Sequence, residues 1–477
     1  MNRSEWLALL LAAAAIVFQS FVPPTVGLAN NGDFPKITGP FDVGNPSDDK
    51  DVMRFADLKY VVDSRYHYDS GFYSSELLFV VAALALNSVF GHPDIFDLRF
   101  IGAVHAAFFL FTLYLFLPLA RLLPRISRFV VIFFIIFVFT DVVYVSYFNS
   151  FYMDTAALLF LLLFATLFLR SVSWRRPVDR WLCVAAAVLL VTSKTQHFAL
   201  GIPIALLFAW KGGIVTRGRD RVFQTLSAGI VLAATVFNPL WGTPRNYSSM
   251  AAYSVIFSGL LPHSTNVAAD LRELGLDNSY RQYIGTNAYS TNTGLRDPHF
   301  EAAFIQGGYV SRIALFFLRH PSRALDAATA RMDTAGLQRP YLGNFDRSTG
   351  RPEYAKSQSF AMWSGLKTRI FGRHGLRYLI YSLLLTGFVT VLAVARRKSM
   401  LPGMPEAIWT LLALMLIELA VASFGDVLDS ERHYLLFSVL TDLLIVCGFC
   451  LAASAINATP MRHSADALFK TATARGS

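Results

Sequence analysis

Residues 6–34 read WLALLLAAAAIVFQSFVPPTVGLANNGDF, an apolar run that ends in an acidic turn. The part from 6 to 23 is apolar and nearly as long as a helix that crosses a bilayer. Val22-Pro23-Pro24 stands where a signal peptide would carry its small-x-small cleavage site, so the run is expected to be an uncleaved signal anchor. Asn30-Asn31-Gly32-Asp33-Phe34 follows shortly after. Asp33 is a functional candidate, because ionisable groups are costly to place at membrane depth.

The composition is that of a membrane protein, since 54% of the residues are hydrophobic and only 16% are charged. An ordinary soluble domain is about one quarter charged. The net charge of +10 does not indicate nucleic-acid binding, because the basic residues sit in short clusters between apolar runs, where they mark cytoplasmic loops. The three cysteines, Cys183, Cys447 and Cys450, lie inside apolar runs and are expected to be buried small residues rather than a redox or metal pair.

The apolar pattern predicts an all-α, polytopic membrane protein with about ten transmembrane helices. The predicted spans are 6–23, 100–119, 128–147, 154–170, 181–194, 198–210, 222–241, 376–395, 405–423 and 433–453. With the N-terminus in the cytoplasm, the clusters of Lys and Arg between spans all fall on the cytoplasmic side. These clusters are Arg3; Arg121, Arg125 and Arg128; Arg170, Arg175, Arg176 and Arg180; Lys211, Arg217, Arg219 and Arg221; Arg396, Arg397 and Lys398; and Arg462, Lys470 and Arg475. We therefore expect a multi-pass protein of the plasma (inner) membrane with both termini in the cytoplasm.

The segment 75–91 is apolar enough to cross the membrane, but a crossing there would put the cluster that begins at Arg121 on the outside. We expect a helix at the outer membrane interface instead; the alternative is a further span that violates the charge rule. This helix belongs to a first external loop, 24–98, which is acidic and carries Asp48, Asp49 and Asp51. The chain is thus expected to divide into an N-terminal transmembrane module, 1–242, an extracytoplasmic helical segment, 243–375, and C-terminal transmembrane helices with a cytoplasmic tail, 376–477. Within the middle segment, helices are expected around 248–261 and 309–317.

Four polar stretches lie at span ends on the predicted outer side. They are 30–34 with Asp33; 147–154 with Asn149, Tyr152 and Asp154; 193–197 with Lys194 and His197; and 426–434 with Asp426, Asp429, Glu431, Arg432 and His433. Because all four face the same way, we expect them to converge on one polar cavity at the outer leaflet. Its carboxylates would supply an acid or a base. Lys194 and Arg432 would suit a lipid phosphate, because Arg forks onto phosphate oxygens and Lys acts as a compact charge.

Each candidate also has a simpler interpretation. Asp33 follows Gly32 in a sequence that is typical of a turn. Lys194 could extend its ammonium group to the lipid headgroups, and Arg432 could form a structural ion pair with Glu431 or Asp429. Asn149 and Tyr152 are ordinary residues of a membrane-interface belt. Motifs for other chemistries are missing from the sequence, which has no Walker-type phosphate loop, no zinc-ligand spacing and no Gly-x-Ser-x-Gly elbow.

The layout of these motifs resembles the GT-C superfamily, whose members are multi-spanning glycosyltransferases that use polyprenyl-phosphate sugars and include the aminoarabinose and protein mannosyl transferases. The resemblance rests on Tyr73-Ser74-Ser75-Glu76-Leu77-Leu78, Phe90-Gly91, Asp97-Leu98-Arg99-Phe100 and Ser193-Lys194-Thr195. More narrowly, Gly32-Asp33-Phe34 and the stretch 147–152, YFNSFY, are similar to bacterial membrane proteins of the glycan-biosynthesis hexose transferase type. The match covers approximately residues 1–240 and the last two spans.

The resemblance implies a GT-C-like bundle in which a polyprenyl-phosphate sugar enters laterally from the outer leaflet and gives its sugar, with inversion, to a hydroxyl of a glycan, lipid or protein acceptor. A general base must take the hydroxyl proton; Asp33 is the expected base, with Asp154 and Glu431 as alternatives. Lys194 and Arg432 would offset the charge that develops on the phosphate. The other predicted substrate-binding residues are His197, His433, Asn149, Tyr152 and Arg99. Membrane lipids are expected partners and nucleic acid is not. No cofactor or metal is predicted, although the site is compatible with a divalent metal.

A transporter or lipid flippase is the alternative function. Such a protein would carry polar residues through the depth of the membrane and on both of its faces. Here the middle of the spans is nearly free of charge, with Asp141, Glu418 and Asp442 as the main exceptions, and the polar turns gather on the outer side. This asymmetry favours an enzyme whose site lies at one leaflet.

Overall fold

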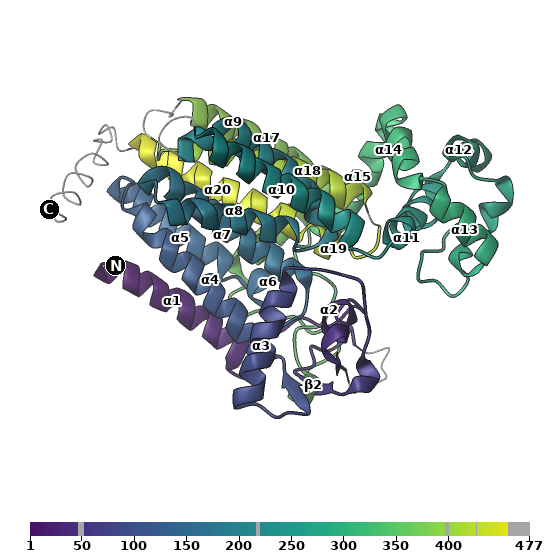
Figure 1. Cartoon of the computed structure of the whole chain (residues 1–477), viewed down its shortest axis with the longest axis horizontal. Coiled ribbons are helices and arrows are strands. Elements are labelled where there is room, and N and C mark those ends of the chain that lie inside the picture. Colours follow the sequence, from purple (N-terminus) through teal and green to yellow (C-terminus); the bar gives the residue numbers. More distant parts are fainter. Residues whose placement is uncertain (46–51, 216–219, 396–399, 426, 457–477) are drawn as a thin grey trace.

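The computed structural model describes residues 1–45, 52–215, 220–395, 400–425 and 427–456. In the described chain, seven helices are long and apolar enough to cross a membrane: α1 (Arg3–Phe21), α4 (Arg99–Ala120), α7 (Met153–Trp174), α10 (Arg221–Trp241), α17 (Gly375–Ala395), α18 (Met404–Phe424) and α20 (Leu435–Ile456). Three shorter helices run beside them in the bundle: α5 (Arg125–Phe139), α8 (Pro177–Val191) and α9 (Gly201–Val215) (Figure 1). Every predicted span contains one of these helices, so the all-α, polytopic membrane fold is confirmed.

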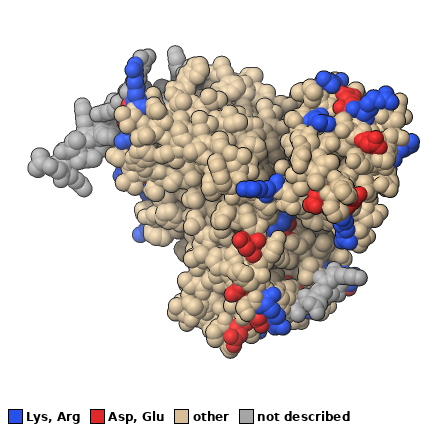
Figure 2. All heavy atoms as spheres, turned by 45° about the vertical axis from the view of Figure 1, so that its right-hand side comes forward, with Lys and Arg blue, Asp and Glu red and all other residues tan. Residues whose placement is uncertain are grey.

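Several charged residues named above lie outside the described residues. They are Asp48, Asp49, Asp51, Asp426, Arg217, Arg219, Arg396, Arg397, Lys398, Arg462, Lys470 and Arg475. Among the described parts, the N-terminus of α1 and the C-terminal end of α20 lie at the same end of the bundle (Figure 1). In Figure 2, charged side chains gather over the parts beyond the opposite end, while the middle of the bundle shows almost none. An uncharged belt of this kind is what a bilayer requires.

Helix α7 is the centre of the bundle. In α7, 89% of the apolar window lies buried inside the protein, against 22% in α17. The helix is apolar on every side, which is typical of a helix surrounded by others, and it packs against α4, α8, α18 and α20. Its first turn, with Asp154, is buried at the end of the bundle against which the loop 24–98 folds.

The predicted span 128–147 is wrong in its second half. Helix α5 ends at Phe139, and a short helix, α6 (Val142–Val145), follows after a break. The break is caused by Asp141, whose carboxylate caps α6 through Val143 N at 2.9 Å and accepts hydrogen bonds from the backbone of Trp363 and Ser364 at 2.9 and 3.0 Å. Asp141 thus lies at the bundle end and not in the middle of a span.

The two short predicted spans around 193–197 are separate helices. Between α8 and α9, the chain forms an extended residue, Lys194, and a 3₁₀ helix, η3 (Thr195–Leu200). Ser193 Oγ is satisfied by the carbonyl of Leu190 at 2.6 Å. Because the helix is interrupted here, the Lys194 side chain points towards the first turn of α7, where it contacts Asp154.

The first external loop folds against the bundle end. Its elements are α2 (Pro35–Thr38), η1 (Gly39–Phe41), β1 (Val43–Gly44), β2 (Lys59–Val62), η2 (Ser64–Tyr66), α3 (Glu76–Phe90) and β3 (Ile95–Asp97). The strands form an antiparallel sheet in the order β1-β2-β3, with Val43 opposite Val62 and Tyr60 opposite Phe96. This sheet is not predicted from the sequence, because its strands are too short to show an alternating pattern.

Helix α3 is the segment expected at the membrane interface. Phe79, Val80 and Ala83 are buried, while Val89 and Phe90 are 71% and 74% exposed. The helix packs on α4 and α7 and runs across the direction of α1 in Figure 1. An apolar helix that is buried on one side and exposed on the other fits the interfacial placement.

The long outer segment begins with a small lobe that has its own apolar core. Its elements are α11 (Tyr247–Ser254), the π-helical turn η4 (Val255–Leu260), η5 (Leu261–His263), α12 (Val267–Leu274), η6 (Asn278–Tyr283), η7 (Gly294–Arg296), α13 (Pro298–Gln306) and α14 (Tyr309–Arg319). Helices form at both predicted stretches, as α11 with η4 and as α14. Helix α15 (Pro321–Ala335) then leads back to the bundle, where it packs on α17 and on α19 (Ser430–His433).

After α15 the chain is not helical. Residues 337–361, the strap, include only the short turn η8 (Arg347–Thr349) and lie along the first external loop. Gly27 N and Ala29 N donate to the carbonyls of Asn344 and Gly343 at 3.0 and 2.9 Å, and Arg347 Nε pairs with Asp57 at 2.9 Å. The strap therefore fixes the residues that lead from α1 to Asp33.

Helix α16 (Met362–Phe371) follows the strap and is anchored by one buried carboxylate. Asp442 accepts hydrogen bonds from Lys367 Nζ at 2.9 Å, Trp363 Nε1 at 2.7 Å and Tyr144 OH at 2.6 Å. Lys367 and Asp442 are 4% and 0% exposed. The Lys367–Asp442 pair is therefore buried and has hydrogen-bond partners on both oxygens of Asp442.

Replacing Lys367 by methionine is expected to destabilise the protein by about 3–5 kcal/mol, because Asp442 is left charged and buried without its cation. Thermal unfolding in detergent measures this as a lower Tm. The double variant Lys367→Met/Asp442→Asn should recover most of the loss, since asparagine can still accept from Tyr144 and Trp363. Equal melting of the single and double variants would contradict a charged pair.

Candidate active site

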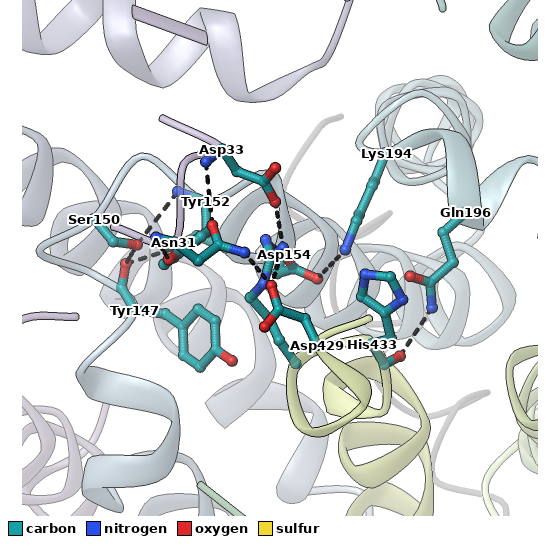
Figure 3. Close-up of polar contacts among 12 residues, drawn as sticks. Asn31, Asp33, Tyr147, Ser150, Tyr152, Asp154, Lys194, Gln196, Asp429 and His433 are labelled. Atoms are coloured by element: carbon teal, nitrogen blue, oxygen red, sulfur yellow. Dashed lines mark hydrogen bonds and ion pairs between the residues drawn. The ribbon is translucent and has the colours of Figure 1, made fainter. Parts of the chain in front are cut away.

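Arg432 is the centre of an ion cluster at the end of the bundle against which the loop 24–98 folds. Figure 3 shows Asp33, Asp154, Lys194 and Asp429 of this cluster. Its Nη1 donates to Asp154 Oδ2 at 3.3 Å, and its Nη2 donates to Asp33 Oδ2 and, at 3.4 Å, to Asp429 Oδ2. The Arg432 side chain is only 3% exposed. A buried guanidinium thus joins three carboxylates that come from the first external loop, from α7 and from the turn before α19.

Two lysines complete the cluster. Lys194 Nζ donates to Asp154 Oδ1 at 2.9 Å, and Lys36 Nζ pairs with Asp33 Oδ1 at 2.5 Å. Asp33 and Asp154 are therefore each paired through both oxygens. Three cations face three carboxylates in this cluster, so it is formally neutral.

Hydrogen bonds within the turn 30–34 orient Asp33 towards the cluster. Asn30 Oδ1 accepts from Gly32 N at 2.8 Å and from Phe34 N at 3.2 Å, and Asn31 Oδ1 accepts from Asp33 N at 3.1 Å. Gly32 has a φ of +100°, which a glycine adopts without strain. The turn interpretation of this stretch is thus correct for its backbone, while the carboxylate of Asp33 itself points to Arg432.

Tyr152 links that turn to α7. Its hydroxyl donates to the carbonyl of Ala29 at 2.6 Å and accepts from Asn31 N at 2.9 Å. Its ring lies under Arg432, with the guanidinium carbon 4.5 Å from the ring centroid. A cation over an aromatic face is stabilised by the ring quadrupole, so Tyr152 both orients Arg432 and holds the turn that carries Asp33.

The charges fix the protonation states in the cluster. Burial raises the pKa of Asp33, but the charges of Arg432 and Lys36 outweigh it and hold that pKa well below its usual value. Burial, together with the charges of Lys194 and Arg432, lowers the pKa of His433 well below its usual value. Asp33 is therefore ionised and His433 neutral at pH 7. Asp33 stabilises the fold above pH about 4, and this contribution is lost as the pH falls towards its folded pKa.

His197 lies one step away from the cluster. Its Nδ1 and Glu418 Oε1 are 2.7 Å apart, and Gln196 Nε2 donates to Glu418 at 3.1 Å and to the carbonyl of His433 at 2.8 Å. The ring of His433 lies beside Lys194 and Gln196 in Figure 3. Glu418 thus links His197 to Gln196, and Gln196 in turn holds the backbone of His433.

Besides His197, the predicted site residues Asn149, Arg99 and Glu431 lie outside the cluster. Asn149 is buried and donates to the carbonyls of Ser20 and Val26 at 2.9 and 2.8 Å, which ties the end of α1 to the turn before α7. Arg99 pairs with Asp97 at the start of α4. Glu431 makes no ion pair with Arg432 in the described chain; burial and the charge of Asp429 raise the pKa of Glu431, with Lys356 opposing.

Sequence reasoning missed Lys36 and the amide of Asn31, which contacts Asp429. The spacing of Lys36 three residues after Asp33 was the available signal. Among the described residues, no group of three or more His, Cys, Asp or Glu side chains is placed to hold a metal ion.

A cavity of about 330 Å³ lies beside the cluster and is lined by polar residues, Arg245 among them, and by apolar residues. Lys194, Gln196 and His433 line it where it meets the cluster. Its other walls come from the end of α10, from α11 and α14 in the lobe and from the end of α18, through Pro239, Tyr247, Ala251, Val310, Ile313, Val421 and Phe424. A ligand with an anionic head and an apolar tail would find both kinds of surface there.

Comparison with known proteins places the chain in a family. A comparison with curated proteins finds no match. Among solved structures, the archaeal oligosaccharyltransferase AglB from Archaeoglobus fulgidus, in complex with an inhibitory peptide and a dolichol-phosphate, is similar with 13% sequence identity and a TM-score of 0.38. That similarity covers 93% of this chain and 50% of the other, so this chain spans about half the length of AglB. The family model of the YfdI N-terminal transmembrane domain matches residues 2–469, and the chain therefore belongs to that family.

Proposed function

We propose that the protein is an integral-membrane glycosyltransferase of the plasma membrane, which moves a sugar from a polyprenyl-phosphate donor to an acceptor hydroxyl on the extracytoplasmic face, with inversion. One observation carries the proposal. Two carboxylates, Asp33 and Asp154, meet two cations, Lys194 and Arg432, at the outer end of the bundle and beside a cavity with polar and apolar walls. These are the groups that such a transfer needs.

The reaction breaks the bond between the anomeric carbon and the phosphate oxygen, and the electron pair leaves with the polyprenyl phosphate. The acceptor oxygen bonds to the anomeric carbon while its proton moves to a carboxylate. A phosphate leaving group needs cations rather than a proton, and one carboxylate suffices as general base. The acceptor is a glycan, a lipid or a protein that carries a free hydroxyl.

Asp33 is the carboxylate that we assign as the base. Its side chain is 17% exposed, against 3% for Asp154, so an acceptor hydroxyl can reach Asp33 from the outside. Asp154 lies deeper and binds both Lys194 and Arg432. We therefore assign Asp154 the role of positioning the two cations.

The closed ion pairs of Asp33 suggest how the donor activates the base. With Arg432 and Lys36 on its two oxygens, Asp33 is a weak base, since both charges lower its pKa. A donor phosphate bound next to Lys194 and His433 would compete with Asp33 for Arg432. Asp33 would then regain a free lone pair and a higher pKa only when the donor is in place, which limits loss of the sugar to water.

The cavity beside Lys194 and His433 is the proposed donor site. Its polar wall would take the phosphate, and its apolar wall would take the first part of the hydrocarbon chain. An anionic phosphate would also raise the pKa of His433, which now lies between cations. His433 could then donate a proton in a hydrogen bond to the bound phosphate.

A transporter or flippase would need polar groups along a path through the membrane. In the described chain, several ionisable residues inside the bundle form pairs, such as Glu418 with His197 and Asp442 with Lys367. The buried cations Lys194 and Arg432, which would bind the phosphate, lie together at one end of the bundle. This distribution supports transfer at one leaflet over movement across the bilayer.

The purified protein, given a polyprenyl-phosphate hexose and an acceptor, is expected to release polyprenyl phosphate and form a glycoside. Lys194→Met should lower kcat/KM by about 10²-fold, because one charge that stabilises the leaving phosphate is lost. Lys59→Met is a matched control, since Lys59 is exposed on β2 away from the cluster. Turnover that is equal in both variants would remove Lys194 from the site. Movement of the lipid between leaflets without any glycoside would show the flippase instead.

A further inference from the structure

Helix α14 has apolar residues on its outer side as well as on its inner side. The inner side packs into the core of the lobe through Tyr309, Ile313, Phe316 and Phe317. On the outer side, Val310, Ala314 and Leu318 follow each other at four-residue spacing, so they share one flank of the helix. Val310 is 57% exposed and Leu318 is 79% exposed. The lobe does not cover this flank.

A different flank of α14 is cationic. Arg312 and Arg319 are seven residues apart and therefore lie one above the other, and the helix contains no acidic residue. Arg312 donates to the carbonyl of Leu274 at 2.8 Å, and Arg319, which is 58% exposed, lies 3.6 Å from Glu273. A basic amphipathic helix with a separate apolar flank is typical of helices that lie in a membrane surface.

The apolar flank continues the lipid-facing surface of the bundle. At the end of α10, Phe237, Leu240 and Trp241 are 43%, 57% and 63% exposed, and a tryptophan at a span end marks the membrane interface. The cavity beside Lys194 has Pro239 of α10 on one wall and Val310 of α14 on another. The flank of α14 thus begins where the exposed apolar surface of α10 ends.

We propose that α14 lies in the outer surface of the bilayer, with Val310, Ala314 and Leu318 among the acyl chains and with Arg312 and Arg319 near the phosphate headgroups. The lobe is then seated on the membrane and does not stand in water. The cavity between α10 and α14 opens towards lipid as a result. This placement does not depend on glycosyl transfer; on the proposed function, the opening is where a lipid-linked donor enters.

Fluorescence quenching in phospholipid vesicles tests the placement. The full-length protein carries a bimane label on Leu318→Cys or Val310→Cys, and both positions are exposed, so the lobe core is left intact. Lipids with brominated acyl chains should quench most of the label's fluorescence at either position, while iodide in the water should quench little of it. The wild type, treated with the same bimane reagent, gives the background from the native cysteines. Of these, Cys183 and Cys450 are buried and Cys447 is half-buried.

Ala302→Cys on α13 is the control, because Ala302 is exposed and α13 lies on the side of the lobe away from the bundle (Figure 1). Its label should respond to iodide and not to brominated lipid. If the label at 318 responds as the label at 302 does, α14 stands in water and the proposal fails. Quenching by brominated lipid at 318 and 310 together, with none at 302, supports it.

Discussion

Replacement of Asp33 by asparagine is expected to lower kcat/KM for sugar transfer by about 10³-fold, while the protein remains folded. Asparagine keeps the shape of the side chain and can still accept from Arg432, but it cannot take a proton from the acceptor hydroxyl. Asp33 is also more exposed than Asp154, so an acceptor hydroxyl can reach its carboxylate. Release of polyprenyl phosphate and glycoside formation, measured with saturating donor, report the loss.

Asp63→Asn is the matched control for this variant. Asp63 lies in the same external loop, where its carboxylate caps η2 and pairs with Arg65 at the surface, away from Arg432. Its activity should equal that of the wild type. The donor affinity of Asp33→Asn should not fall, because the variant removes a negative charge from the phosphate site. Full activity in Asp33→Asn would move the base to Asp429 or Glu431.

The convergence of the site could be predicted from the sequence because a bilayer has a fixed thickness. Helices that cross it bring their ends to the same face, so the turns of Asp33, Asp154, Lys194 and Arg432 had to lie at one level. The structure brings these four side chains into direct contact. Which carboxylate pairs with which cation could not be predicted from the sequence, because it depends on side-chain positions within an ångström or two. Lys36 shows this best, since a charge three residues away in a turn is more often solvated.

The strap and the breaks in the bundle could not be predicted for a different reason. Residues 337–361 have no apolar period, and their order comes from backbone hydrogen bonds such as those to Gly27 and Ala29. Backbone pairing of this kind leaves no pattern in the side chains. The span expected at 128–147 is apolar on both sides of Asp141. Helix α5 nevertheless ends before Asp141, whose carboxylate accepts a hydrogen bond from the backbone N–H of Trp363. A partner more than two hundred residues away decides that boundary.

Replacement of Arg432 by methionine is expected to cause a large loss of stability and a large loss of activity together. The guanidinium is the one cation in the described cluster that contacts Asp33, Asp154 and Asp429 together. Its removal leaves Asp429 without a cation and the other two carboxylates with one lysine each. Breaking a buried charge pair costs about 3–5 kcal/mol, so Tm in detergent should fall, and kcat/KM should fall by about 10³-fold.

Two further variants separate the structural role of Arg432 from its role in the reaction. Arg432→Lys keeps the charge but loses the fork that joins Asp33 to Asp154, so it should fold with a Tm near that of the wild type and still lose about 10²-fold in kcat/KM. Arg432→Met/Asp429→Asn removes the carboxylate that is left without a cation and should regain part of the Tm without regaining activity. Recovery of activity together with Tm in that double variant would mean that Arg432 only holds the fold. A loss that persists after Tm recovers would place its charge at the leaving phosphate.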